Sequence, residues 1–256
     1  MTDGAAATAA RFLGRVGDYA RARPGYPLAI RDFLVAEGAL FPGAAVADVG
    51  AGTGLSTGLL LDGGYEVVAV EPNAEMRAAA DERFASDPRY RSLAGSAEAT
   101  GLPDRSVDLV IAAQAFHWFD PAAARAEWRR ILREPKRAAL IWNSRRSSGT
   151  PFLERYERLL VDFGTDYAQV GHRGVGVERL TAFFCAPYAT FSTPNSQTLD
   201  RAGVRSRLLS SSYIPAAGTP RHAELLAELD RLIDETSTGD AVEIVYDCEV
   251  FLGSLP

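Results

Sequence analysis

Short apolar runs alternate with amphipathic stretches through the middle of the chain. Five runs have the length and composition of strands, over residues 44–49, 66–70, 90–94, 107–112 and 137–142. Between them, apolar residues recur at helical spacing over residues 55–61, 73–84 and 121–133. Strands that alternate with helices in this way predict right-handed crossovers and a parallel sheet with helices on both faces.

The two flanks carry further elements but no repeat and no linker. Their patterns predict helices over residues 27–37, 152–163 and 222–235, and strands over residues 188–199 and 241–252. Because no composition shift separates these elements from the middle of the chain, we expect one domain. Residues 145–215 are interpreted as a cap inserted into it.

Composition excludes several classes of protein. The chain has 256 residues, of which 47% are hydrophobic and 23% are charged, as in an ordinary folded domain. No apolar run reaches the roughly 18 residues that a membrane span needs, and the N-terminus lacks the basic start and apolar stretch of a signal peptide. Two cysteines and three scattered histidines predict neither a disulfide framework nor a metal site. We therefore expect a cytoplasmic protein without a metal or a membrane partner.

The charge balance argues against nucleic acid as a partner. Lys and Arg number 27 against 33 Asp and Glu, which gives a net charge of −6, whereas nucleic-acid proteins carry a basic excess or stripe. The densest basic cluster, over residues 129–137, lies at the end of a predicted helix, where cations complement the helix dipole. We interpret it as a solvated surface.

Three alternate glycines are the strongest chemical signal. Gly50, Gly52 and Gly54 lie between an apolar strand and a helix, where glycine permits a sharp turn and a close approach to a ligand. Glu71 ends the next strand, a position from which a carboxylate can accept hydrogen bonds from ribose hydroxyls. A dinucleotide fingerprint would require glycine where Leu55 stands, and Asp48 precedes the loop. A nucleoside ligand other than a dinucleotide is therefore favoured.

Four segments together resemble class I S-adenosylmethionine-dependent methyltransferases. They are VADVGAGTG, VVAVEPNAEM, GSAEATGLPDRSVDLV and AQAFHWFD, which follow one another in order and spacing within residues 44–143. The resemblance implies a Rossmann-like α/β fold with a seven-stranded, mostly parallel sheet and an antiparallel last strand over residues 241–252. It also implies S-adenosylmethionine as cofactor and S-adenosylhomocysteine as product. The expected organisation is an N-terminal lid and helices over 1–40, a cofactor-binding core over 44–143, a cap over 145–215, and a final helix and strand over 216–256.

The resemblance also assigns cofactor-binding roles to individual residues. Gly50, Ala51 and Gly52 would pass against the methionine part of the cofactor, and Glu71, followed by Pro72, would hold the ribose. The adenine would lie near Met76 and be bordered by Ser96, Ala97 and Glu98, and Gln114 would form the floor beneath the sulfonium. Tyr19 and Arg23 would reach inward if the N-terminal segment closes as a lid. The alternative is that residues 11–27 pack against the edge of the sheet.

The His-Trp-Phe-Asp segment resembles a narrower, small-molecule branch that includes trans-aconitate methyltransferase-like proteins. We expect the acceptor to contact Phe116, His117, Trp118, Trp142, Asn143 and Tyr213. His117 is the candidate catalytic residue, because an imidazole at this point can take a proton from an acidic nucleophile. The alternatives are that His117 orients the substrate or has a structural role, and that an arginine orients a carboxylate substrate.

The sequence thus predicts an enzyme that transfers a methyl group to a small-molecule acceptor, at oxygen, by in-line displacement. Three alternatives stay open. One is an RNA or protein methyltransferase, another is a cofactor-binding protein of this fold without transfer activity, and the third is a fold whose bound sulfonium assists a different reaction. The sequence does not indicate an oligomeric state.

Overall fold

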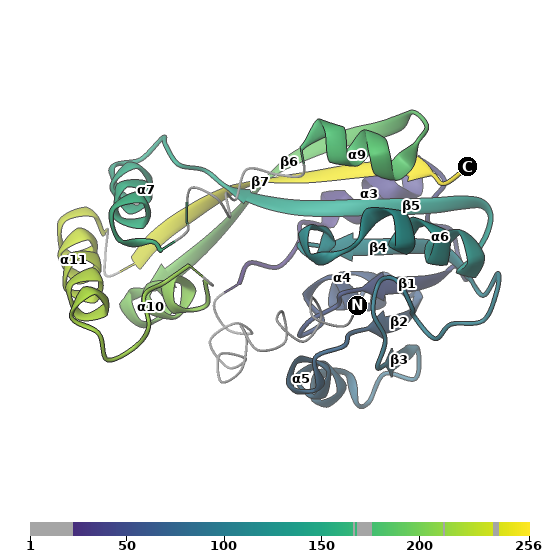
Figure 1. Cartoon of the computed structure of the whole chain (residues 1–256), viewed down its shortest axis with the longest axis horizontal. Coiled ribbons are helices and arrows are strands. Elements are labelled where there is room, and N and C mark those ends of the chain that lie inside the picture. Colours follow the sequence, from purple (N-terminus) through teal and green to yellow (C-terminus); the bar gives the residue numbers. More distant parts are fainter. Residues whose placement is uncertain (1–22, 166, 168–175, 212, 238–240) are drawn as a thin grey trace.

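One seven-stranded sheet organises the described part of the chain, in the order β3-β2-β1-β4-β5-β7-β6. The structure is a computed structural model that describes residues 23–165, 167, 176–211, 213–237 and 241–256 (Figure 1). The strands are β1 (Ala45–Val49), β2 (Glu66–Val70), β3 (Tyr90–Leu93), β4 (Val107–Ala113), β5 (Leu132–Arg145), β6 (Tyr188–Asp200) and β7 (Ala241–Ser254). Strands β1 to β5 pair in parallel, whereas β7 is antiparallel to both β5 and β6. The predicted α/β fold, with its antiparallel last strand, is confirmed.

The predicted helices begin and end close to their expected positions. The helices of the described residues are α3 (Leu28–Ala36), α4 (Leu55–Leu61), α5 (Ala74–Phe84), α6 (Pro121–Ile131), α7 (Pro151–Phe163), α9 (Val177–Phe184), α10 (Arg201–Leu209) and α11 (Pro220–Thr236). Asn73 caps α5, since its side chain accepts hydrogen bonds from the backbone N–H groups of Glu75 and Met76. Asp120 caps α6 in the same way, with Pro121 in the first turn.

Two boundaries and two helices differ from the sequence prediction. Helix α6 ends at Ile131 rather than near residue 133, and β5 begins directly after it at Leu132. The pairing of β5 with β4 is interrupted between Leu132 and Arg137, so an irregular segment of the strand lies where the pattern indicated a turn. Helices α9 and α10 were not predicted. Helix α9 has only eight residues, and only three of the nine residues of α10 are buried.

Both faces of the sheet are buried. Side chains alternate between faces along a strand, so Val49 and Val110 join one hydrophobic cluster while Val46 and Ile111 join another. Helices α6 and α9 supply apolar residues to the first cluster, and α3 and α4 supply them to the second. The carboxyl ends of β1 to β5 therefore share one edge of a sheet that is covered on both sides, the edge where ligands bind in such folds.

A third hydrophobic cluster forms away from the parallel strands. It joins α7, α10 and α11 to the first half of β7, and we refer to these three helices as the helical lobe. Figure 1 shows β6 and β7 running from the sheet into this lobe. Helix α9, in contrast, packs with the sheet through Phe183 and Phe184. The division of the chain at residues 145–215 and 216–256 stays a prediction.

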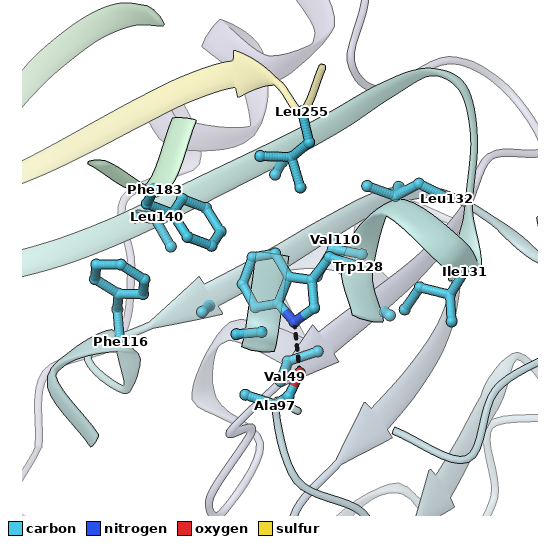
Figure 2. Packing of buried hydrophobic residues seen from close by; sticks show 14 of the residues in the cluster. Val49, Ala97, Val110, Phe116, Trp128, Ile131, Leu132, Leu140, Phe183 and Leu255 are labelled. Atoms are coloured by element: carbon cyan, nitrogen blue, oxygen red, sulfur yellow. Dashed lines mark hydrogen bonds between the residues drawn. The ribbon is translucent and has the colours of Figure 1, made fainter. Parts of the chain in front are cut away.

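Trp128 of α6 lies at the centre of the first cluster. Its side chain is fully buried among Val110, Phe183 and neighbouring residues (Figure 2). The indole N–H donates a hydrogen bond of 3.1 Å to the carbonyl oxygen of Ala97. The apolar core of the sheet is thereby joined to the loop that follows β3.

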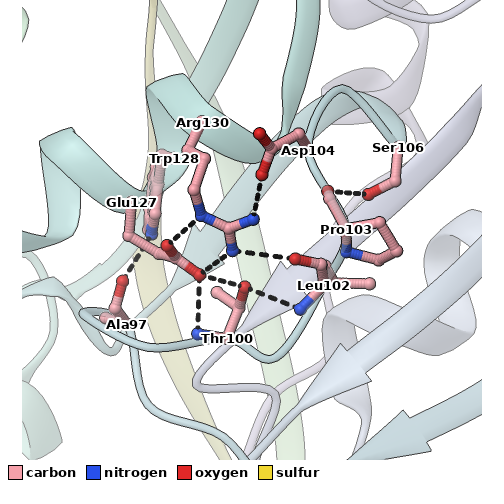
Figure 3. Close-up of polar contacts among 9 residues, drawn as sticks. All are labelled: Ala97, Thr100, Leu102, Pro103, Asp104, Ser106, Glu127, Trp128 and Arg130. Atoms are coloured by element: carbon pink, nitrogen blue, oxygen red, sulfur yellow. Dashed lines mark hydrogen bonds and ion pairs between the residues drawn. The ribbon is translucent and has the colours of Figure 1, made fainter.

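A polar network fastens the same loop to α6 from the surface. One Glu127 oxygen accepts hydrogen bonds from both the backbone N–H and the hydroxyl of Thr100, and Arg130 pairs with Glu127 and Asp104 (Figure 3). The Arg130 guanidinium and the Thr100 hydrogen bonds lower the pKa of Glu127 to about 2. Arg133 pairs with Asp108 in the same region, so much of the basic cluster predicted as a solvated surface is neutralised by ion pairs.

Replacing Trp128 by Ala tests this packing. We expect Trp128→Ala to lower the free energy of unfolding by about 3–5 kcal/mol, because the substitution leaves a large cavity. Urea unfolding followed by circular dichroism measures the change. Arg129→Ala, at the exposed neighbouring position, should change stability by less than about 0.5 kcal/mol. Equal losses in both variants would show that Trp128 does not anchor the core.

Candidate functional site

The loop between β1 and α4 carries three glycines with left-handed backbone. The φ angle is +72° at Gly50, +57° at Gly52 and +81° at Gly54, a region that other residues rarely adopt. A Cβ atom on Gly50 would lie 2.5 Å from the Cβ of Ala115, so packing also requires glycine there. At Gly52 an added Cβ would find only the Met76 sulfur within 4 Å, at 3.8 Å, among the described residues. Space for a ligand therefore lies over Gly52.

Glu71 joins this loop to the turn after β2. One carboxylate oxygen accepts a hydrogen bond from the N–H of Gly52 and the other from the N–H of Asn73, each at 2.9 Å. The residue is 7% exposed, and burial raises its pKa, while the two N–H groups and Arg77 oppose the rise. A carboxylate offers about four lone-pair positions. Two acceptor positions thus remain for hydroxyl donors of a ligand.

Asp48 is a second buried carboxylate, directly before the glycine loop. Its Oδ2 accepts hydrogen bonds from the hydroxyls of Ser56 and Thr57, each at 2.7 Å, in the first turn of α4. Burial raises the pKa of Asp48 to about 6, and the charge of Glu71 adds to the rise. The Oδ1 of Asp48 and the hydroxyl of Thr53 are buried without a hydrogen-bond partner in the described part of the chain. Two carboxylates and two unsatisfied polar atoms favour a polar ligand with positive charge.

The ends of β4 and β5 form the other side of the site. Gln114 follows β4 with φ +57°, uncommon for a residue other than glycine, and its side-chain amide donates to the carbonyl oxygen of Asn143 at 2.7 Å. The Asn143 side chain donates in turn to the carbonyl oxygen of Gly25, at 3.2 Å. The segment before α3 is therefore held against the ends of both strands.

A pocket lies where these strand ends meet the helical lobe. The sheet side contributes Gln114 and Asn143, the helical lobe contributes Arg207, and β7 contributes Tyr246. Among the described residues, the lining is Arg23, Pro24, Tyr26, Leu55, Gln114, Asn143, Arg207 and Tyr246. A ligand in this pocket would contact the chain from its N-terminal part to its last strand.

Comparison with known proteins identifies the family. The sequence pattern of a methyltransferase domain matches residues 47–139. Over 254 residues the chain is 30% identical to an uncharacterised methyltransferase-like protein of Schizosaccharomyces pombe, and the match covers 94% of this chain and 93% of that protein. This chain belongs to the class I S-adenosylmethionine-dependent methyltransferases.

Two further similarities agree with this assignment. An uncharacterised methyltransferase of Mycobacterium tuberculosis is 46% identical over 136 residues, which is 52% of either chain. This match thus spans about half the length of that relative. A solved structure from Anaeromyxobacter dehalogenans, assigned as a type II methyltransferase, superposes with a TM-score of 0.65 at 25% identity and covers 91% of this chain and 98% of that one. The fold and the family are therefore shared beyond the glycine loop.

The residues of this methyltransferase fit the cofactor of the family. S-adenosylmethionine carries a ribose diol, which suits the remaining acceptor positions of Glu71. It also carries a sulfonium and an ammonium group, which suit the negative charge of Asp48 and Glu71. The open side of Gly52, next to Met76, leaves room for it. Glu71 and the glycine loop would hold this cofactor.

The other predicted cofactor residues lie on both sides of Glu71. Met76 is buried in α5, Pro72 is exposed, and Ala97 holds Trp128 through its carbonyl oxygen. Ser96 and Ala99 hydrogen-bond to each other through their backbones, while a Glu98 carboxylate oxygen accepts from the N–H of Asp120 at 3.0 Å. Tyr19 lies outside the described residues, and so does most of the predicted lid. The contacts of all these residues with the cofactor stay predictions.

The predicted acceptor-binding residues are not gathered in one place. Asn143 lines the pocket, but Phe116 and Trp142 belong to the hydrophobic cluster around Trp128, and Tyr213 packs in the helical lobe. Trp118 is half-buried in the 3₁₀ turn η1 (Phe116–Trp118). Most of these apolar side chains therefore pack in hydrophobic clusters, and their contact with an acceptor stays a prediction.

His117 lies in the same turn, with its ring centroid 4.4 Å from that of Trp118 and 5.3 Å from that of Trp142. The residue as a whole is exposed. Partial loss of hydration of the imidazole, together with repulsion from the guanidinium groups of Arg179 and Arg23, lowers its pKa to about 4. His117 is consequently uncharged near neutral pH. A neutral imidazole can accept a proton or a hydrogen bond, so the base role and the orienting role both stay predictions.

Most of the described lining of the pocket was not predicted from the sequence. Arg207 and Tyr246 come from α10 and β7, outside the strand ends of the core where the predicted site residues lie. One signal was available for Arg207. Val204, Arg207 and Leu208 have the i, i+3, i+4 spacing of one helix face, and all three are buried. A charged residue on the apolar face of a helix indicates a candidate binding site rather than a solvent-exposed position.

Other predictions concern chemistry outside the pocket. No group of three or more His, Cys, Asp or Glu that could hold a metal ion is found in the described ranges. No helix of the described chain is long and apolar enough to cross a membrane. Both cysteines are free: Cys185 is exposed at the C-cap of α9, and Cys248 is buried in β7.

The protonation of His117 can be measured without a substrate. In an NMR titration, the imidazole signal that disappears in His117→Asn should be one that does not titrate above about pH 5, because loss of hydration and nearby guanidinium groups favour its neutral form. His222→Asn serves as the matched control, since it removes a different one of the three histidine signals. A titration midpoint of about 6.5 for His117 would contradict this account.

Proposed function

We propose that this methyltransferase transfers the methyl group of S-adenosylmethionine to an oxygen atom of a small-molecule acceptor. The observation that carries the proposal is the position of Glu71. Its buried carboxylate fixes the glycine loop and still has lone pairs for a ribose, at the same strand edge as the pocket lined by Gln114 and Arg207. Cofactor and acceptor sites would thus adjoin.

The reaction is a displacement at carbon. When bound, the cofactor supplies a methyl group on a sulfonium, and the carbon–sulfur bond breaks with its electron pair going to sulfur as an acceptor lone pair forms the oxygen–carbon bond. A hydroxyl acceptor also loses its proton. In this kind of reaction most of the rate enhancement comes from holding the two reactants in line and excluding water.

The chain's own residues supply that positioning. Gln114 is fixed by its backbone hydrogen bond to Ile141 and its side-chain hydrogen bond to Asn143, so its strained backbone keeps one orientation beside the glycine loop. Neutral His117, in the next turn, would accept a hydrogen bond or the proton of a hydroxyl acceptor. Asp48 and Glu71 provide negative charge on the cofactor side.

A small acceptor agrees better with the surroundings than a macromolecule does. Residues of both the sheet and the helical lobe line the pocket. These two walls limit the size of an acceptor that can bind between them. Binding of nucleic acid would need a surface patch of unpaired Lys and Arg side chains, but Arg130, Arg133 and Lys136 are each ion-paired. These observations support a small molecule, and no observation favours a cofactor-binding protein without transfer activity.

Replacing Glu71 by Gln tests the cofactor site. An amide offers one oxygen acceptor and directs N–H groups at the N–H of Gly52 or Asn73, so both the loop and the ribose contact should suffer. We expect calorimetric titration to show an affinity for S-adenosylhomocysteine about 10- to 100-fold lower than that of the wild-type chain.

Glu66→Gln is the matched control, because Glu66 is exposed at the opposite end of β2. Its affinity should equal that of the wild type. If neither S-adenosylmethionine nor S-adenosylhomocysteine binds the wild-type chain at millimolar concentration, the proposed function is wrong. If both bind and Glu71→Gln has no effect, the cofactor lies elsewhere.

A further inference from the structure

A buried cation faces the pocket from the helical lobe. Arg207 is 5% exposed and lies on the apolar stripe of α10 between Val204 and Leu208. Removing a guanidinium from water is costly unless it is paired and hydrogen-bonded. The partners of Arg207 therefore indicate whether its charge is already compensated.

Within the described residues, Arg207 has only neutral partners. Its Nε donates to the Tyr246 hydroxyl and its Nη1 to the Ser211 hydroxyl, each at a long 3.3 Å. Nη2 has no hydrogen-bond acceptor in the same described part. A guanidinium presents five N–H donors in a fixed fork, so part of the hydrogen-bonding capacity of Arg207 is available to a ligand.

Three other arginines near Arg207 are compensated by carboxylates. Arg145, whose side chain is also buried, pairs with Glu157. Arg201 and Arg205, on the same helix as Arg207, both pair with Asp230. Arg207 differs from these three in lacking a carboxylate partner among the described residues. Arg221 of α11 also has no printed carboxylate partner, but it is exposed and donates to the carbonyl oxygens of Asp162 and Phe163.

The described lining of the pocket is also one-sided in charge. It includes two guanidinium groups, those of Arg23 and Arg207, and no Asp or Glu. This is unexpected in a chain with 33 acidic and 27 basic residues. Arg23 is partly engaged, since its Nη2 donates to the carbonyl oxygen of Ser210. A pocket without an acidic wall in an acidic protein favours an anionic ligand.

We propose that the methyl acceptor carries a carboxylate group and that Arg207 binds this carboxylate at the lobe side of the pocket. A carboxylate matches the guanidinium fork with two parallel hydrogen bonds. The Tyr246 hydroxyl, which also lines the pocket, keeps the guanidinium in place. This inference rests on the proposed function, and it makes Arg207 a specificity-determining residue.

The test compares carboxylic acids with their neutral and phosphorylated counterparts. The probes are aliphatic, alkenyl and aromatic hydroxy acids and dicarboxylic acids, each with its primary amide and, where it exists, its phosphate monoester. Binding to the full chain in the presence of S-adenosylhomocysteine is measured by calorimetry, and methyl transfer is measured with labelled S-adenosylmethionine. We expect one or more acids to bind and be methylated, while the matching amides are about 10- to 100-fold weaker.

Variants of Arg207 assign that preference to this residue. Arg207→Gln should lower the affinity for the acid about 10- to 100-fold while the affinity for S-adenosylhomocysteine stays unchanged. Arg207→Lys keeps the charge without the fork and should retain part of the preference. Arg205→Gln is the matched control on the same helix, because Arg205 pairs with Asp230 and does not line the pocket. It should behave as the wild type does.

Each result separates this inference from the proposed function. Failure of the wild-type chain to bind S-adenosylhomocysteine contradicts the proposed function itself. If that ligand binds but acids and amides are equivalent, if no acid binds, or if only phosphate esters bind, the carboxylate inference is wrong and the cofactor assignment stands. Should Arg207→Gln fail to fold, the acid preference of the wild type and of Arg207→Lys decides the matter.

Discussion

One buried carboxylate determines how the site is built. Glu71 accepts hydrogen bonds from the N–H groups of Gly52 and Asn73, and so it joins the loop after β1 to the turn that opens α5. Burying a negative charge at this point is unfavourable, which is why the pKa of Glu71 is raised. The two N–H groups offset the cost of burying this charge. The N–H of Gly52 belongs to the loop in which all three glycines have left-handed backbone. The conformation of the glycine loop, the start of α5 and the orientation of the Glu71 carboxylate therefore depend on one another.

The second half of the site depends on strands that are longer than the parallel sheet requires. β5 pairs with β7 from Arg137 to Arg145, and β7 pairs with β6 along its whole length. These strands extend into the helical lobe (Figure 1), so Tyr246 and Arg207 are carried to the carboxyl edge where Gln114 and Asn143 lie. The core thus offers two carboxylates where a cationic, ribose-containing cofactor would bind, and the lobe adds a guanidinium to the wall of the pocket.

Most of the fold could be predicted from the sequence because local signals agreed with the tertiary structure. The Val-rich run of β2 is buried on both faces, and Asn73 and Asp120 start their helices through side-chain caps. The glycine loop and Glu71 could be recognised as a candidate cofactor site, since glycine spacing and a carboxylate at a strand end are sequence-local features, and their contacts with a cofactor stay a prediction. The lining of the pocket could not be recognised in the same way, because it depends on which side chains reach the pocket from distant elements. Phe116 and Trp142 have an aromatic character that suits either a pocket or a core, and packing placed them in the core.

The central claim is that Glu71 and the glycine loop form the ribose end of a cofactor site adjoining the pocket of Arg207. A crystal structure of the full chain with S-adenosylhomocysteine tests it most directly. The account predicts the ribose hydroxyls within hydrogen-bonding distance of the Glu71 carboxylate and the ligand over Gly52, with its sulfur directed toward the pocket that Gln114 lines. A ligand bound at any other edge of the sheet, or a ribose that leaves Glu71 without contact, would contradict it.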